Sequence, residues 1–203
     1  MTGRTEYVQA VALLRAGSHE DAVRAVAAAS VGAWLAVPDD PAWQPWLAGS
    51  FAKSVRRARP AQYAALSGWA AASAGFGDAR ACAGPPTTYP GMDPRVAGLQ
   101  VSGTELARAG WPGPGPGPTV LLDDSLGMST GKAAAQAAHA LFAWAVHLSA
   151  PARADWQADG MAFSVLGLPG PDFARAAARP GPVTIADAGH TEVAPGSTTA
   201  IIR

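Results

Sequence analysis

The segment that decides the fold reads Pro118-Thr-Val-Leu-Leu122-Asp-Asp-Ser-Leu-Gly-Met-Ser-Thr-Gly131-Lys-Ala-Ala-Ala-Gln-Ala-Ala-His-Ala-Leu-Phe-Ala-Trp144. Its apolar start, Pro118–Leu122, is typical of a buried strand, and the turn-rich residues that follow lead into a helix expected from about Gly131 to His147. Short apolar strands that alternate with helices predict an α/β layered domain. Further strands are expected at Met161–Leu168, Val183–Ala186 and Thr198–Ile202, and a helix at Asp172–Ala178.

The first half of the chain repeats this pattern at an offset of 110 residues, without a gap. Two pairs of tryptophans align at this offset, although chance similarity between two alanine-rich segments remains an alternative. The aligned pairs are Gly17/Gly127, Trp34/Trp144, Pro41/Pro151, Trp46/Trp156, Ser54/Ser164, Val55/Val165 and Tyr63/Phe173. The elements expected here are Tyr7–Leu14, Glu20–Leu35, Phe51–Val55, a helix at Pro60–Ala72 and Arg95–Val101.

The boundary between the halves is the run Trp111-Pro-Gly-Pro-Gly-Pro-Gly-Pro118, which favours no regular element. We predict an α/β fold of two similar three-layer lobes, each a small mixed sheet flanked by helices, packed as an internal pseudo-dimer. The predicted division is a structural lobe over residues 1–110, a linker over 111–117 and a second lobe over 118–203.

Composition excludes several classes of protein. The 203 residues carry 15 basic and 15 acidic side chains, so the total charge does not indicate a strongly basic nucleic-acid binder. The single Cys82 cannot form an intramolecular disulfide or a thiolate metal site, and no apolar run is long enough for a membrane span. The first residues lack the pattern of a signal peptide, so we expect a cytoplasmic protein.

Three polar side chains interrupt the otherwise apolar helix after Gly131. Lys132, Gln136 and His139 share one face because they are spaced i, i+4 and i+7. They form either an exposed stripe on an amphipathic helix or a site at the helix N-terminus, where free N–H groups attract an anion. A phosphate-binding P-loop is excluded because only three residues separate Gly127 from Gly131 and Ala133 follows the lysine.

The second informative stretch is Asp187-Ala-Gly-His-Thr191-Glu-Val-Ala-Pro-Gly-Ser197. Alone it is an ordinary turn after a strand. Together with Leu126-Gly-Met-x-x-Gly131-Lys-x-Ala-Ala-Gln136-x-x-His139 it resembles the type 2 peptidyl-tRNA hydrolase family over about Pro118–Arg203.

The resemblance implies a mixed sheet between helices, no metal or other cofactor, and an esterase that releases peptides from the 3′ end of tRNA. It places Lys132, Asp187 and Thr191 at functional positions, with His139 beside them as an alternative base. We expect Lys132 to supply a positive field, helped by the helix N-terminus, and Asp187 to orient the lysine or the attacking water. Substrate contacts are expected from Gln136, Gly131 and Ser197.

The first half looks like a degenerate copy that kept its core and lost this site. At an offset of 110, Ala22, Val26 and Ala29 occupy the places of the three polar residues. Residues 118–203 hold five basic against seven acidic side chains, which is unusual for a protein that binds tRNA. The run Lys53-Ser-Val-Arg56-Arg57-Ala-Arg59 in the first half either grips the tRNA backbone or is a solvated edge.

These observations predict hydrolysis of the ester bond between peptide and tRNA, a step in translation that recycles tRNA. Two alternatives remain open: a related hydrolase that acts on another aminoacyl or peptidyl ester, and a non-catalytic RNA-binding scaffold. The expected partner is peptidyl-tRNA, and the expected assembly is a monomeric pseudo-dimer or a homodimer.

Overall fold

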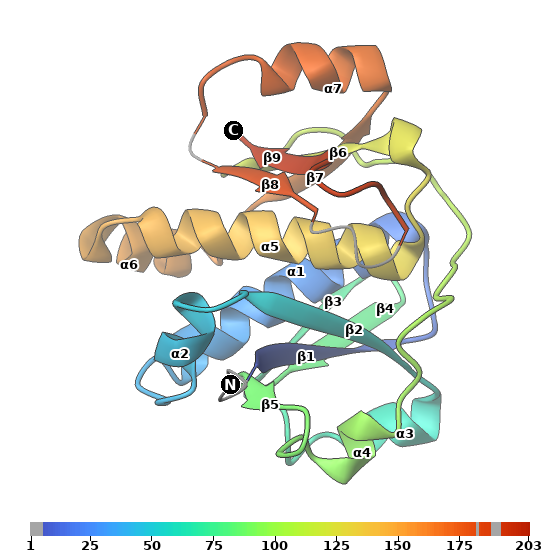
Figure 1. The fold of residues 1–203 in the computed structure, drawn as a ribbon, viewed down its shortest axis with the longest axis vertical. Coiled ribbons are helices and arrows are strands. Elements are labelled where there is room, and N and C mark those ends of the chain that lie inside the picture. Colours follow the sequence, from blue (N-terminus) through green and yellow to red (C-terminus); the bar gives the residue numbers. More distant parts are fainter. Residues whose placement is uncertain (1–5, 182, 188–191) are drawn as a thin grey trace.

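Figure 1 shows the chain as five stacked layers, helix, sheet, helix, sheet and helix, along its longest axis. The computed structural model describes residues 6–181, 183–187 and 192–203. The first lobe contains β1 (Tyr7–Leu14), α1 (His19–Ala36), α2 (Trp43–Leu47), β2 (Ala52–Ala58), α3 (Pro60–Ala64), β3 (Ala72–Phe76), β4 (Ala79–Ala83), β5 (Thr87–Thr88) and α4 (Pro94–Ala97). The second contains β6 (Thr119–Asp123), the short 3₁₀ helix η1 (Asp124–Leu126), α5 (Thr130–His147), α6 (Ala150–Ala158), β7 (Ser164–Leu168), α7 (Gly170–Ala177), β8 (Val183–Ala186) and β9 (Thr198–Ile202).

The two sheets have the same topology. The first has the strand order β2-β1-β4-β3, with β5 paired to β1, and the second has the order β7-β6-β9-β8. In each sheet one pair, β1 with β2 or β6 with β7, is parallel, and the other pairs are antiparallel. The predicted fold of two similar lobes, each with a mixed sheet between helices, is therefore confirmed.

Helices α1 and α5 form the middle layer, where the lobes meet (Figure 1). Their alanine-rich faces allow close approach, and one continuous hydrophobic core includes residues of both lobes. Phe142 of α5 is fully buried among four aromatic rings of the first lobe. The centroids of Trp34, Trp43, Trp46 and Phe51 lie 5.0–5.7 Å from its own.

Local geometry supports the internal repeat at the predicted offset. The indole N–H of Trp46 donates to the carbonyl of Ala52 at 2.7 Å, and that of Trp156 donates to Ala162 at 2.8 Å. The two non-glycine residues with positive φ in the described ranges, Phe51 (54°) and Met161 (55°), are also 110 positions apart.

Within the central helices, however, the repeat is shifted by one residue. Ser18 caps α1 and Ser129 caps α5, and each hydroxyl accepts from the backbone N–H three residues later, at Asp21 and Lys132 respectively. The offset here is 111 because Met128 adds one residue before the cap. The counterparts of the three polar residues are thus Asp21, Ala25 and Ala28, which corrects the assignment to Ala22, Val26 and Ala29.

The helix expected over Pro60–Ala72 is wrong after its first turn. Helix α3 ends at Ala64, and Ala72 begins strand β3, which forms a tight hairpin with β4. Small residues such as Ala72, Ala74 and Ala81 carry little β propensity, so the hairpin depends on packing against α1 rather than on a local signal.

Candidate functional site

The site lies where the first turn of α5 meets the end of β8. Lys132 is the third residue of the helix, and Gln136 lies one turn further on the same face. Strand β8 ends at Ala186, so Asp187 is the first residue beyond it. Because α5 packs on β8 and β9, the helix and the strand end bring these three side chains together.

The Asp187 carboxylate is held from two directions. Its Oδ2 accepts from the ammonium of Lys132, with which it forms an ion pair, and from the Gln136 amide Nε2 at 2.7 Å. The side chains of Lys132 and Asp187 are only 12% and 6% exposed. A charged pair so poorly solvated is costly unless its hydrogen bonds are well placed, so its presence points to a function beyond stability.

Thr199 of β9 supports this pair through Gln136. The threonine hydroxyl, which is fully buried, donates to Gln136 Oε1 at 2.8 Å. That contact turns the amide so that its N–H faces the carboxylate. Sequence analysis expected Thr199 in a strand and gave it no role in the site; its position two residues after Ser197 was the available signal.

Hydrogen bonds join the two ends of the segment from Asp187 to Ser197 and connect it to helix α5. The backbone N–H of Asp187 donates to the Ser197 carbonyl at 2.9 Å, and that of Gly196 donates back to Asp187 at 2.8 Å. Ser197 therefore contributes backbone to the site. Glu192 accepts from the N–H and the hydroxyl of Ser129, at 2.8 and 2.7 Å, and so ties the loop to the start of α5. Sequence analysis missed Glu192.

The backbone N–H groups at the start of α5 are largely used within the protein. Gly131 donates to the Thr104 carbonyl at 3.2 Å, and Lys132 donates to the Ser129 hydroxyl at 3.1 Å. The Thr104 side chain lies next to Gly131, since a Cβ on the glycine would be 3.4 Å from it, in ordinary van der Waals contact. Positive charge toward a substrate therefore comes from the Lys132 ammonium more than from these N–H groups.

His139 lies apart from the ion pair. Seven residues of helix separate it from Lys132, which is about 10 Å along the axis. Its ring contacts Phe51 of the first lobe, with centroids 5.2 Å apart. Burial, and then the charges of Lys53 and Lys132, lower the pKa of His139 well below its usual range, so the imidazole is neutral at pH 7.

Lys53 occupies an aromatic cage in the lobe interface. Its ammonium lies 4.1–4.4 Å from the ring centroids of Trp46, Phe51 and Phe142 and donates to Gln9 Oε1 at 3.2 Å. Burial lowers the pKa of Lys53 well below its usual value. This lysine is therefore held inside the interface, away from the surface where a tRNA backbone would bind.

Arg56 and Arg57 face opposite sides of the first sheet because they are neighbours on β2. The Arg56 guanidinium is buried and donates to the carbonyls of three residues of the α4 segment, at 3.1–3.4 Å. Arg57 lies on the opposite face of the sheet, where it donates to the Gly103 carbonyl at 2.9 Å and to Gln100. Thr191 lies outside the described residues.

The first lobe cannot form an equivalent ion pair. Asp21 occupies the position of Lys132, and Gly77, the first residue after β3, occupies that of Asp187. Gly77 has a φ of 49°, and a Cβ there would lie 2.5 Å from the Asp21 carboxylate, so a side chain at this position would be strained and would displace Asp21. The loop is also lost, because only Gly77 and Asp78 connect β3 to β4.

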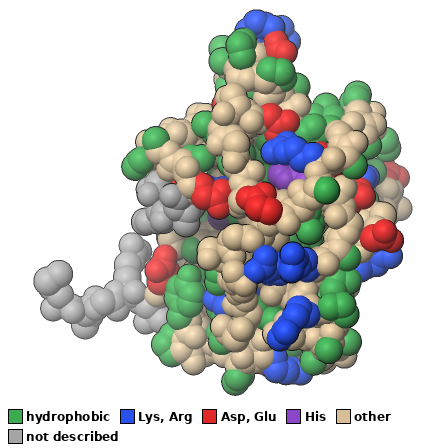
Figure 2. All heavy atoms as spheres, turned by 90° about the vertical axis from the view of Figure 1, so that its right-hand side faces the viewer, with side chains coloured by type: hydrophobic (Ala, Val, Ile, Leu, Met, Phe, Trp, Pro, Cys, Tyr) green, Lys and Arg blue, Asp and Glu red, His purple; other side chains and the backbone are tan. Residues whose placement is uncertain are grey.

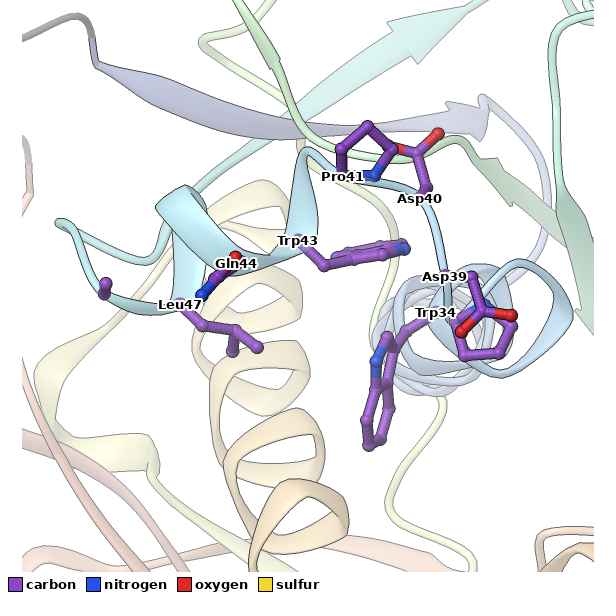
Figure 3. Close-up of a pocket in the computed structure, with 9 residues that line it drawn as sticks. Trp34, Asp39, Asp40, Pro41, Trp43, Gln44 and Leu47 are labelled. Carbon is purple, nitrogen blue, oxygen red and sulfur yellow. The ribbon is translucent and has the colours of Figure 1, made fainter.

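A hollow lies far from the ion pair, beside the C-terminal end of α1 (Figure 3). It encloses about 570 Å³ and is lined by Trp34, Trp43, Asp39, Asp40 and Gln44, among others. Trp34 is fifteen residues along α1 from His19, about 22 Å from the end of the helix layer where the ion pair lies. This hollow is therefore not part of the candidate site.

Two further features are absent from the described ranges. No group of three or more His, Cys, Asp or Glu side chains there is placed to hold a metal ion. Among the same residues, no helix has the length and apolar character needed to cross a bilayer. Cys82 is buried in the first sheet, and burial raises its pKa to about 11, so its thiol is protonated at neutral pH.

The fold and the site define the second lobe as an α/β domain with a buried lysine–aspartate pair at a helix N-terminus. Residues 119–202, which span β6 to β9, match the family model of peptidyl-tRNA hydrolase PTH2. The similarity to this family that the sequence indicated is thus confirmed for the second lobe. Comparison with curated proteins and with solved structures gave no match.

Proposed function

We propose that the chain hydrolyses the ester bond that joins a peptide to the 3′ end of tRNA, and that the site is the Lys132–Asp187 pair. The observation that carries the proposal is this buried pair, supported by Gln136, inside the segment that matches the hydrolase family. The second lobe supplies the chemistry, and the first lobe packs against it as a structural partner over about residues 1–110.

The chemistry follows from the charges of the pair. When water attacks the ester carbonyl, negative charge develops on the carbonyl oxygen, and the Lys132 ammonium is placed to stabilise it. Asp187 holds the ammonium in position and offers a carboxylate oxygen that orients the attacking water. Thr191 would add a hydroxyl from the same loop. His139 lies about two helical turns from Lys132, so we assign it no role in taking the proton of the attacking water.

A double-mutant cycle tests whether the two groups act as one unit. Lys132→Met and Asp187→Asn should each lower kcat/KM on N-blocked aminoacyl-tRNA by about 10²-fold or more, and the double variant should lose little beyond that. Arg175→Gln, an exposed change on α7, is the matched control. Additive losses in the double variant, or full activity in either single variant, would sink the proposal.

The acidic charge of the second lobe favours one competing function, a related hydrolase that acts on an ester without tRNA. Its five basic and seven acidic side chains give a tRNA backbone little to bind. The two functions are separated by the substrate: hydrolysis of simple aminoacyl esters with no preference for tRNA would support the competitor.

A further inference from the structure

Most arginines of the described chain already have a structural partner. Arg24, Arg95, Arg108 and Arg175 pair with carboxylates, while Arg56, Arg80, Arg153 and Arg203 donate to backbone carbonyls. Of the remaining arginines in the described ranges, none pairs with a carboxylate, and all lie wholly or partly exposed; the only side-chain hydrogen bonds among them are those of Arg57 to Gly103 and Gln100 and of Arg59 to Gln62. These arginines are Arg15, Arg57, Arg59 and Arg179, and the first three belong to the first lobe.

The parallel pairing of β1 with β2 brings these three together. Leu13 pairs with Arg57 and Leu14 with Ala58, so the two strands end side by side. The backbone N–H of Arg15 then donates to the Ala58 carbonyl at 3.0 Å, next to Arg59. The three arginines thus form one cluster at the carboxyl ends of β1 and β2.

This cluster lies beside the N-terminus of α5. Arg57 donates to the Gly103 carbonyl at 2.9 Å, and the carbonyl of the next residue, Thr104, accepts from Gly131 at 3.2 Å. Gly103, which contacts Arg57, and Thr104, which contacts the residue before Lys132, are neighbours in the chain, with Cα atoms about 3.8 Å apart. The carboxyl ends of β1 and β2 and the start of α5 also lie at the same side of the molecule in Figure 1.

Charge is unevenly distributed over the face of the molecule where the arginine cluster and the start of α5 lie. In Figure 2 the Lys and Arg side chains gather mainly over the lower half, which the first lobe occupies, and acidic side chains are more frequent above them. Guanidinium groups bind phosphate oxygens through parallel hydrogen bonds, and exposed ones bind a polyanion without regard to sequence.

We propose that Arg15, Arg57 and Arg59 form a track on the first lobe that binds the phosphate backbone of an RNA substrate and directs its 3′ end to Lys132 and Asp187. This inference rests on the proposed function for the identity of the ester. It gives the degenerate lobe a role in substrate binding, and it supplies the cations that the second lobe lacks.

The test is the salt dependence of binding to a deacylated tRNA, measured by fluorescence anisotropy between 50 and 200 mM KCl. Each lost phosphate contact lowers the slope of log K against log [salt] by about 0.7–0.9. We expect Arg15→Gln/Arg57→Gln/Arg59→Gln to lower the slope by about two to three and to raise Kd at 0.1 M salt by about tenfold or more. The corresponding triple lysine variant keeps the charges and should keep the slope.

The control removes the same charge elsewhere: Arg95→Gln/Arg175→Gln/Arg179→Gln alters exposed arginines of α4, α7 and the turn after it. A slope that stays at the wild-type value in the first variant, or falls equally in the control, overturns the proposal, as does a wild type that does not bind tRNA. Because no hydrolysis is measured, a reduced slope in an inactive protein would support the track and contradict only the proposed activity.

Discussion

Replacing Phe142 with alanine should destabilise both lobes at once, because this side chain of the second lobe is buried among rings of the first. Phe142 is 0% exposed, with the centroids of Trp46 and Phe51 at 5.0 and 5.6 Å. Loss of a buried phenylalanine costs about 3–5 kcal/mol, which is a large part of the 5–15 kcal/mol typical of a folded protein. For a chain of this length, each kcal/mol lowers Tm by about 2–4 °C, so we expect a fall of roughly 6–20 °C.

Thermal and urea unfolding, followed by tryptophan fluorescence and far-UV circular dichroism, measure this effect. The two probes should report one coincident transition in the wild type and in Phe142→Ala. Phe173→Ala is the matched control, since Phe173 lies on α7, outside the interface, and is 3% exposed. It should lower the same single transition. Two separate transitions, or a change below about 1 kcal/mol for Phe142→Ala, would refute the idea that the lobes form one folding unit.

Three other expectations concern the glycine repeat, the caged lysine and the loop anchor. Gly17 and Gly127 both have positive φ, so replacing either with alanine should lower the free energy of unfolding, by about 1–2 kcal/mol at Gly127. Gly17→Ala should cost more, because only there would a Cβ meet backbone, 2.6 Å from the nitrogen of Ala79. Equal losses in urea unfolding would contradict this. Burial keeps the pKa of Lys53 in the folded protein below 10.5, its value in the unfolded chain. Between the two pKa values the unfolded chain binds more protons, so the free energy of unfolding rises with pH, by at most about 1.4 kcal/mol per pH unit. Lys53→Met should therefore gain stability relative to the wild type at pH 7 and lose that gain near pH 10.5; a difference that does not change with pH argues against the assignment. Glu192→Gln should weaken the tie between loop and helix, raising amide hydrogen exchange in residues 192–197 with α5 unchanged; an unaltered exchange rate would show that the tie does not hold the loop.

The repeat and the fold class could be predicted from sequence because tryptophan and glycine mark fixed points of each lobe. Trp46 and Trp156 make the same hydrogen bond, and Gly17 and Gly127 both have positive φ. The one-residue shift inside the helices escaped prediction. A constant offset matched Gly17 with Gly127 before the helices and Trp46 with Trp156 after them, and only the hydrogen bond of each serine cap reveals the register at the start of the helices.

The site could be predicted in part. Lys132 and Asp187 followed from a resemblance between motifs, and the structure brings their side chains into contact. Glu192 gave no local signal, since its partner Ser129, the cap of α5, lies 63 residues earlier in the chain. The run Lys53–Arg59 was interpreted as one basic segment, with the strand expected to end at Val55. The strand continues to Ala58, and its alternation sends Arg56 and Arg57 to opposite faces.

The central claim is tested most directly by release of an N-blocked amino acid from its tRNA, measured as a time course with catalytic amounts of the purified chain. The account predicts many turnovers per molecule of protein and a rate that falls by about 10²-fold or more in Lys132→Met. A folded protein that binds tRNA and releases no amino acid would contradict the account and support a scaffold instead. Release that persists in Lys132→Met would contradict it equally, because the ester would then be cleaved without the residue on which the proposed site depends.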